Sequence, residues 1–241
     1  MDKIEILGKG ISLIVTEDHG FGTDALLLAD FASPKRKDMV IDLGTGCGII
    51  PMLFKRNGVT APIYGMDIQE NAYKQFLRTL EINPSLENVI PVHGDLRNLP
   101  DFLPKGRFRL VTMNPPYKPV NTGIISESES DKIARHETNC TTEDFVKAAA
   151  TLLNYGGRLC ICQRPERLVD IMAAFRAGGI EPKRLRFVSK RPNTRPWLFL
   201  LEGKLHGKPF LQVEPPLFIQ DENGNNSEEL TQIIGEYGRN D

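Results

Sequence analysis

The segment 39–67 constrains the fold of this 241-residue chain more than any other segment does. It predicts a strand, a glycine-rich turn, a helix and a second strand, at 39–43, 44–48, 49–55 and 63–66. A strand and a tight turn followed by a helix that leads back to a parallel strand form a βαβ unit. The segment therefore predicts an α/β fold built around a mainly parallel sheet.

The glycines of the turn also indicate the kind of ligand. Gly44, Gly46 and Gly48 follow the pattern G-x-G-x-G, and Ile49 stands where a dinucleotide-binding turn, G-x-G-x-x-G, has its third glycine. Asp67 ends the next strand, roughly 20 residues on, where an acid accepts hydrogen bonds from ribose hydroxyls. The pattern favours a nucleoside ligand without a pyrophosphate and disfavours an NAD-dependent oxidoreductase.

Four of the predicted parallel strands end in a polar side chain: Asp42, Asp67, Asp95 and Asn114. The third and fourth of these strands are predicted at 88–93 and 108–113. Any one of these residues alone is compatible with an ordinary turn. In open α/β sheets, however, ligands bind beyond the carboxyl ends of the strands, so the four side chains are expected to share one site.

The fourth strand leads into Asn114-Pro115-Pro116-Tyr117. Each proline fixes its own φ and restricts the residue before it to extended conformations, so this segment is expected to form a rigid corner. The corner would hold the Asn114 amide, the Pro115 carbonyl and the Tyr117 ring in an array that suits a planar group bearing an NH2. The alternative interpretation is a proline-rich turn with a surface tyrosine.

Two segments near the N-terminus precede this predicted core. Residues 4–15 indicate a short β-hairpin. Phe21-Gly22-Thr23-Asp24 then precedes an apolar helix, which Thr23 or Asp24 is expected to cap. A polar turn at a helix N-terminus can also receive a ligand carboxylate.

The composition is that of an ordinary globular protein, with 40% hydrophobic and 25% charged residues. The net charge of −1 indicates no partner. No run approaches the ~18 apolar residues of a membrane span, and the N-terminus lacks a secretory signal pattern. We therefore expect a cytoplasmic protein with no membrane partner.

Neither the four cysteines nor the four histidines predict a metal site. Their spacings lack the paired pattern of zinc ligands, so no metal is expected. Cys160 and Cys162 lie two apart in a predicted strand. They are expected to share one face and to pack as small apolar side chains.

Two further segments are candidates for contact with a large polar partner. Residues 118–141 are polar, and a loop of that length is a lid, a binding loop or disordered. Around the last two predicted strands, 184–188 and 197–202, lies a basic cluster: Lys183, Arg184, Arg186, Lys190, Arg191, Arg195 and Lys204. The cluster is either a solvated hairpin rim or a patch for RNA phosphates, with Phe187 or Trp197 nearby for stacking.

In order and spacing, these motifs resemble those of class I S-adenosylmethionine-dependent methyltransferases, in particular the tRNA(Val) adenine-N6 methyltransferase family. The residues that carry the resemblance are 21–24, 42–48, Asp67, Asp95 and 114–117. The resemblance implies a Rossmann-like, seven-stranded, mainly parallel sheet with one antiparallel strand and helices on both faces. We expect a single methyltransferase domain over 1–241, with a hairpin cap at 1–20, a catalytic core at 21–204 and a C-terminal extension at 205–241.

The same resemblance assigns roles to individual residues. Asp42 would hold the amino group of S-adenosylmethionine, Asp67 its ribose hydroxyls and Asp95 its adenine amino group. The full set of cofactor-binding residues that it implies is Gly22, Thr23, Asp42, Gly44, Gly46, Gly48, Asp67, Ile68, Asp95, Leu96 and Asn114.

The predicted reaction is N6-methylation of an adenine in tRNA, in the anticodon stem-loop of a valine tRNA. An exocyclic amino nitrogen is a weak nucleophile because its lone pair is delocalised into the ring. Asn114 Oδ1 and the Pro115 carbonyl are expected to accept its two N–H groups, while Tyr117 stacks on the extruded base. The residues expected to contact the RNA are Arg135, Lys190, Arg191 and Arg195.

The motifs leave three alternatives open. A protein glutamine presents the same planar NH2, although the glutamine methyltransferases that this chain resembles carry a helical domain before the catalytic one. An rRNA N-methyltransferase fits the same motifs. So does a nucleic-acid-binding module that keeps the fold without turnover. The sequence indicates no oligomeric state.

Overall fold

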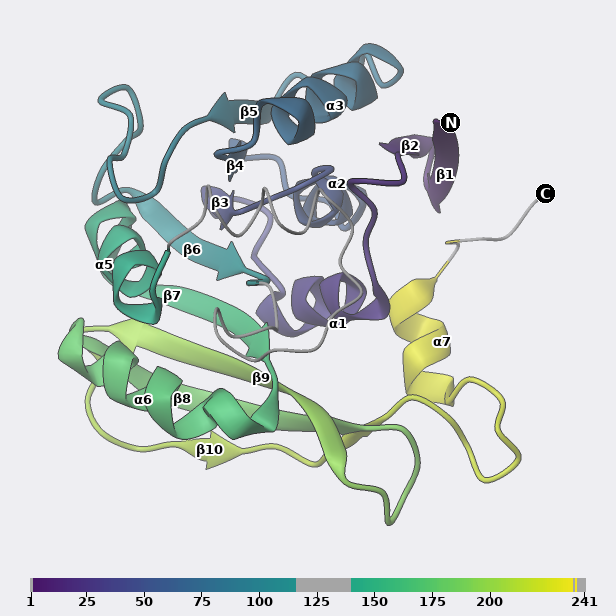
Figure 1. The fold of residues 1–241 in the computed structure, drawn as a ribbon, viewed down its shortest axis with the longest axis vertical. Helices are drawn as coiled ribbons and strands as arrows, with labels where there is room; N and C mark the ends of the chain where they lie inside the picture. The colour runs from purple at the N-terminus through teal and green to yellow at the C-terminus, as the bar shows by residue number, and fades with distance from the viewer. Residues whose placement is uncertain (1, 116–139, 236, 238–241) are drawn as a thin grey trace, which may run out of the picture.

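The computed structural model describes residues 2–115, 140–235 and 237 and contains a central β-sheet flanked by helices (Figure 1). Within these residues the sheet has nine strands, in the order β10-β8-β9-β7-β6-β3-β4-β5, with β11 paired to β8. The strands are β3 Val40–Leu43, β4 Ile63–Asp67, β5 Val89–His93, β6 Phe108–Met113, β7 Leu153–Gln163, β8 Ile180–Ser189, β9 Pro196–Leu205, β10 Gln212–Val213 and β11 Leu217–Phe218.

Strand direction in this sheet follows the prediction, but strand number does not. β9 is antiparallel to β7 and to β8, and the other pairings within this sheet, over the described residues, are parallel. The predicted count of seven is too low by two. The seven long strands are present, and β10 and β11 lengthen the sheet along β8. Strands of two residues leave no period-2 pattern in a sequence, so they escape prediction.

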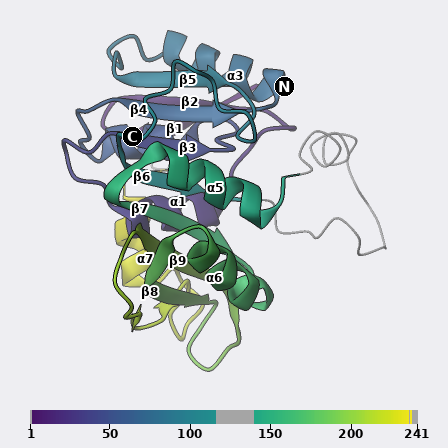
Figure 2. The ribbon, with the colours of Figure 1, turned by 90° about the vertical axis from the view of Figure 1, so that its left-hand side faces the viewer.

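Helices cover both faces of the sheet, as predicted. α5 (Thr142–Leu152) and α6 (Leu168–Ala177) pack on one face, visible on the near side in Figure 2. The other face carries α1 Thr23–Ala32, α2 Ile49–Arg56, α3 Glu70–Glu81 and α7 Glu228–Ile234. Successive strand residues alternate between the two cores; Leu159 and Ile161 face one core, whereas Cys160 and Cys162 face the other. The two cysteines are fully buried, as expected.

The N-terminal hairpin, β1 (Lys3–Gly8) and β2 (Ile11–Val15), forms a separate two-stranded sheet. A hairpin of two strands is marginal by itself. Here side chains at the end of α3 bond the open edge of β2: Asn83 exchanges hydrogen bonds with the Ser12 backbone at 3.0 and 2.8 Å, and Thr79 Oγ1 accepts from Ile14 N. Gln75 donates to the Ile14 carbonyl at 2.8 Å. Helix side chains thus take the place of a third strand and fix the chain that leads to residue 22.

The C-terminal extension folds back onto the rest of the molecule. α7 begins after Ser227, whose hydroxyl accepts from Leu230 N, and it packs against α1. The Arg56 guanidinium, at the end of α2, donates to the carbonyls of Leu7, Ile233 and Ile234. Arg56 therefore joins the hairpin and α7 to the core. Among the described residues, no helix combines the length and apolar character that spanning a membrane requires.

Candidate active site

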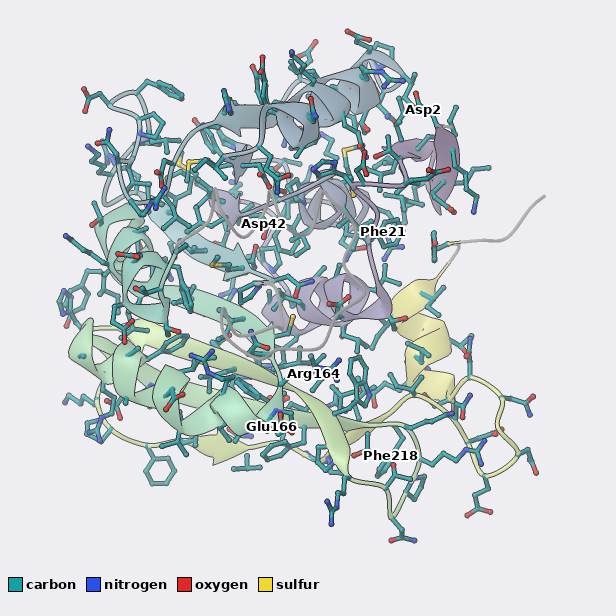
Figure 3. The ribbon with its side chains drawn as sticks, in the orientation of Figure 1. Asp2, Phe21, Asp42, Arg164, Glu166 and Phe218 are labelled. Atoms are coloured by element: carbon teal, nitrogen blue, oxygen red, sulfur yellow. The ribbon has the colours of Figure 1, made fainter. Side chains whose placement is uncertain are left out.

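The four polar strand ends predicted to form a site belong to four neighbouring parallel strands. β6, β3, β4 and β5 are adjacent in the sheet, and Asp42, Asp67, Asp95 and Asn114 lie at or just beyond their carboxyl ends. Asp42 lies near the middle of the molecule (Figure 3). The four side chains predicted to share a site therefore lie along one edge of the sheet, where ligands of open α/β sheets bind.

The glycine turn after β3 has left-handed backbone at all three positions, with φ of 68° at Gly44, 55° at Gly46 and 85° at Gly48. A Cβ at Gly44 or Gly46 would meet no atom within 4 Å, so both glycines border open space. A Cβ at Gly48 would lie 2.4 Å from the Phe76 ring of α3. The first two glycines leave room for a ligand, whereas Gly48 is required for helix packing.

Asp67 links the turn to the next strand. Its carboxylate accepts from Gly46 N at 2.8 Å and from Gln69 N at 2.9 Å, and the residue is only 7% exposed. Burial raises its pKa, while the two backbone hydrogen bonds act in the opposite direction. A carboxylate has about four acceptor positions, so these two bonds leave capacity for hydroxyl donors. Ile68 follows it directly, and its carbonyl contacts His93 Nε2 at 3.0 Å.

Asp42 is the most deeply buried acid of the site, at 2% exposure. The Thr112 hydroxyl donates to Asp42 Oδ1 at 2.7 Å. Burial raises the pKa of the Asp42 carboxyl to about 7, and the hydrogen bond from Thr112 offsets part of that increase. A buried carboxylate with one hydroxyl partner favours a cationic ligand group close by.

Asp95 has a partner that its motif does not indicate, the guanidinium of Arg97. The Arg97 guanidinium donates hydrogen bonds to both carboxylate oxygens of Asp95. Its Nε lies 2.9 Å from Oδ1 and 3.0 Å from Oδ2, and its Nη2 lies 2.7 Å from Oδ2. The ion pair lowers the pKa of Asp95, so the group stays anionic. A ligand amino group would share this carboxylate with Arg97. Leu96 lies in the turn that is closed by a β-bridge between Asp95 and Asn98.

Asn114 is held from two sides. Its Nδ2 donates to Asp24 Oδ2 at 3.0 Å, and its Oδ1 accepts from the Cys162 thiol at 3.0 Å. A carboxylate can only accept, so Asp24 dictates which end of the amide faces it. This contact sets the orientation of the carbonyl oxygen and joins α1 to the end of β6.

The Asp24 contact also corrects the expected capping of α1. The helix starts at Thr23, and its N-cap is Gly22, whose φ of −108° and ψ of 177° are extended; no side chain caps it. Asp24 Oδ1 accepts from Ala25 N at 3.0 Å, while its other oxygen serves Asn114. The side chain that was expected to cap the helix is instead committed to the site.

The basic cluster does not form one patch. Arg184 and Arg186 are neutralised inside the fold, the first by Glu202 and Glu214 and the second by Glu229. Lys183 donates to the Lys208 carbonyl, and Lys204 lies at the opposite end of the β8–β9 hairpin from its turn. What remains is the turn, 190–195, with Lys190, Arg191 and Arg195.

That turn projects from the same edge of the sheet as the site. β8 ends at Ser189 and β9 begins at Pro196, opposite the end of β7. Because β8 and β7 run in the same direction as β6, their carboxyl ends lie on one side. A cleft of about 650 Å³ separates the turn from α1 and is lined by Gly22, Thr23, Asp24, Lys190, Trp197 and Ile219. Three residues of the site motif thus border a cavity that the sequence analysis did not foresee.

The remaining predicted site residues divide into two groups. Pro115 is described and half-buried, so its carbonyl lies directly after the Asn114 anchor. Tyr117 and Arg135 lie outside the described residues. No cluster of three or more metal-ligating side chains is found in the described part of the chain.

Comparison with known proteins gives a consistent picture. The model of the methyltransferase small domain family matches residues 18–174. The chain is 25% identical over 215 residues to the tRNA1(Val) (adenine(37)-N6)-methyltransferase of Vibrio cholerae, covering 89% of this chain and 86% of the relative. Its fold is similar to that of a predicted O-methyltransferase from Agrobacterium tumefaciens, with a TM-score of 0.70, 20% identity and coverage of 88% and 95%. A SAM-dependent methyltransferase from Aquifex aeolicus is also similar, with a TM-score of 0.55, 18% identity and coverage of 76% and 89%.

Proposed function

The chain belongs to the methyltransferase small domain family, and we propose that it methylates N6 of the anticodon-loop adenine of a valine tRNA. It is a S-adenosylmethionine-dependent methyltransferase. The observation that carries the proposed chemistry is the Asn114 amide, whose orientation is set by Asp24 and Cys162 at the end of β6.

The residues at the strand ends fit S-adenosylmethionine. Gly44 and Gly46 border open space, Asp67 has acceptor capacity for ribose hydroxyls, and the Asp42 carboxylate suits a cationic amino group. When bound, the cofactor supplies a methyl group on a positively charged sulfur, and the carbon–sulfur bond breaks with its electron pair on sulfur. We propose that Asp95 binds the adenine amino group together with its Arg97 partner, and that Ile68 and Leu96 lie beside the nucleoside.

Asn114 and Pro115 act on the nucleophile. Their carbonyl oxygens would accept the two N–H groups of the substrate amino nitrogen, which would leave its lone pair available for bond formation. Positive charge develops on that nitrogen as the new N–C bond forms, so the two acceptors bind the transition state more strongly than the neutral ground state. The methylated nitrogen then loses one proton to solvent. An amide oxygen has two lone pairs, so the Cys162 thiol does not use up the acceptor capacity of Asn114 Oδ1.

Support for an adenine in tRNA comes from two directions. The relatives that match most of the chain are named for tRNA1(Val) adenine-37. In addition, the cationic turn 190–195 lies at the edge of the sheet where Asn114 lies, so an RNA strand that reaches the site passes it. We propose that Lys190, Arg191 and Arg195 contact the phosphates, and that Tyr117 and Arg135 complete the RNA site. The whole chain acts as one catalytic unit in this proposal.

The proposed substrate is tested by offering the purified protein bulk tRNA, rRNA and a glutamine-containing release factor with methyl-labelled cofactor. We expect label in tRNA only, recovered as N6-methyladenosine after digestion to nucleosides. Label in rRNA or in protein would replace the proposed substrate. An absence of label from all three, with cofactor binding intact, would favour a binding module without turnover.

Asp24 is expected to affect kcat for methyl transfer by orienting the Asn114 amide. We predict that Asp24→Ala lowers kcat roughly 10- to 100-fold, because a misoriented acceptor loses its alignment with the amino group. The KM for RNA and the cofactor Kd should change only a few-fold. Asp24→Asn keeps an acceptor oxygen and should recover most of kcat. An equal loss in both variants would show that Asp24 acts through its charge and not through the orientation of the amide.

The 190–195 turn is expected to control the salt dependence of RNA binding. Each phosphate contact that is lost lowers the slope of log K against log salt by about 0.7 to 0.9. We predict that Arg191→Glu/Arg195→Glu reduces the slope by roughly 1 to 2. The matched control is Lys183→Glu/Lys204→Glu, with the same charge change at the other end of the hairpin. Equal slopes in the two double variants would make the turn a solvated rim.

A further inference from the structure

The cleft between α1 and the β8–β9 turn has a wall and a rim of different chemistry. Trp197 and Ile219 form an apolar wall, and Lys190 supplies a cation. We propose that this cleft binds the nucleotide next to the target adenine, with its base stacked on Trp197 and its phosphate at Lys190. The inference rests on the proposed function and adds to it the place where a neighbouring base is read.

The position of the cleft follows from one shared residue. Asp24 lines the cleft and also accepts the hydrogen bond from Asn114 Nδ2. The cavity therefore begins one side chain away from the acceptor of the substrate amino group. A base held at Asn114 leaves its neighbour in the strand within reach of the cleft, because consecutive nucleotides of a single strand stack on successive side-chain platforms.

The wall is built to hold a flat ring. Trp197 is half-buried, and its carbonyl accepts from Arg164 Nη1 at 3.2 Å. The guanidinium carbon of Arg164 lies 5.6 Å from the centre of the indole ring. One face of the indole is thus backed by a cation, which fixes the ring. Figure 3 shows Arg164 below Asp42, in the lower half of the molecule in that view.

The C-terminal extension supplies Ile219, the second residue of this apolar wall. Ile219 N donates to the Ser189 carbonyl at 3.0 Å, and Gln220 N donates to the Lys190 carbonyl at 2.9 Å. These hydrogen bonds hold the backbone at Ser189 and Lys190, where the turn begins. Within the described part of the chain, the Lys190 side chain has no ion-pair partner, so its ammonium is available to a phosphate.

Size and lining agree with a nucleotide. The cleft measures about 650 Å³. This lies within the ~300–1,000 Å³ of pockets that enclose small organic ligands. An apolar wall with one cation at the rim matches a base joined to a phosphate. A neutral peptide would offer no negative charge to pair with the lysine. Placing the target adenine itself in the cleft would leave the Asn114 oxygen without its amino group.

The test combines protein variants with RNA that lacks one base. Methylation of a valine tRNA anticodon stem-loop is measured as kcat/KM, with the intact RNA and with abasic sites 5′ or 3′ of the target adenine. Trp197→Leu keeps a smaller apolar side chain without a ring face, and Trp197→Phe keeps a ring. Tyr155→Ala removes an exposed aromatic near the start of β7, at the opposite edge of the sheet, and serves as the control.

We expect wild type to lose roughly tenfold when one of the two neighbouring bases is removed. Trp197→Leu should lose a similar factor with intact RNA and nothing further with that abasic RNA. Trp197→Phe should recover most of that factor, and Tyr155→Ala should behave like wild type. The proposal would be overturned if Trp197→Leu and an abasic site lowered kcat/KM by independent factors that multiply, whether the abasic site is 5′ or 3′ of the target adenine. A loss in Trp197→Leu that is the same for every RNA would also overturn it, since the indole would then contact the target base.

A substitution at Lys190 tests the proposal independently of any effect that the Trp197 variants have on folding. Lys190 is exposed, and Lys190→Gln should lower the salt slope of stem-loop binding by about 1, whereas Lys204→Gln should not change it. Equal slopes would count against the phosphate part of the proposal. If wild type methylates no adenine in any RNA, the proposed function fails and this inference with it. If wild type is active and Trp197→Leu equals it on every RNA, only the inference fails.

Discussion

Replacing Asn114 with alanine is expected to lower kcat for methyl transfer at least ~100- to 1,000-fold. That is the range measured when one preorganised hydrogen-bond partner of a transition state is removed. Cofactor affinity should stay within a few-fold, because the strand-end acids and the glycine turn remain. Single-turnover methylation and calorimetric titration with cofactor give the two quantities. Full activity in Asn114→Ala would exclude the proposed mechanism.

A swap of the two partners makes this prediction specific. Asn114→Asp alone places a carboxylate 3.0 Å from the Asp24 carboxylate, a repulsive arrangement, and should be nearly inactive. Asn114→Asp with Asp24→Asn restores an amide–carboxylate hydrogen bond in the reverse sense and places an acceptor toward the substrate. The double variant should exceed the single one by roughly tenfold or more. Additive losses would show that the two side chains act independently.

The features that the sequence predicted correctly are local ones. A strand, a turn with positive φ and a helix are specified within 39–67, and the polar strand ends follow directly after apolar runs. Neighbouring parallel strands then bring those ends together without any further information. The Asp95–Arg97 pair is also local, two residues apart, but an acid and an arginine at that spacing in a loop do not by themselves specify an ion pair.

The missed features are those that join distant segments. Asp24 and Asn114 lie 90 residues apart in the chain, and nothing in either motif indicates that one orients the other. The docking of β2 on α3 depends on Thr79 and Asn83, which in sequence are ordinary residues of a helix and its end. Gly48, predicted as a cofactor contact, also has a positive φ and packs against the Phe76 ring, a contact that its motif does not indicate.

The basic cluster shows what the period-2 alternation of a strand can predict and what it cannot. Arg184 and Arg186 are two apart in β8, so they share a face, and the acids that neutralise them come from β9 and from the C-terminal extension. The alternation was visible in the sequence, but the position of Glu214 and Glu229 was not. Only the turn residues, which no strand neighbour covers, remain candidates for the phosphate contacts predicted for the cluster.

Asp42→Asn is expected to strengthen the fold and weaken cofactor binding at neutral pH. The pKa of Asp42 is raised from 3.8 to about 7 in the folded chain, so the folded state binds this proton more tightly than the unfolded state does. The free energy of unfolding therefore falls as pH rises from about 4 to about 7, by on the order of 4 kcal/mol for this group. The asparagine variant should lack that decrease and be more stable than wild type at pH 8 in urea unfolding without cofactor.

The same titration predicts a pH dependence of cofactor affinity. Below pH 7 the Asp42 carboxyl is largely protonated, and the amino group of the cofactor meets a neutral partner. Wild-type Kd should fall roughly five- to tenfold between pH 6 and 7.5, while the Kd of Asp42→Asn should be at least about tenfold weaker at pH 7.5 and nearly constant over that range. Asp101→Asn makes the same chemical change at a fully exposed side chain and should alter neither property. If Asp42→Asn destabilised the chain at pH 8, the carboxylate would be a net stabilising group in the folded state. Its burial beside Thr112 could not then be attributed to ligand binding.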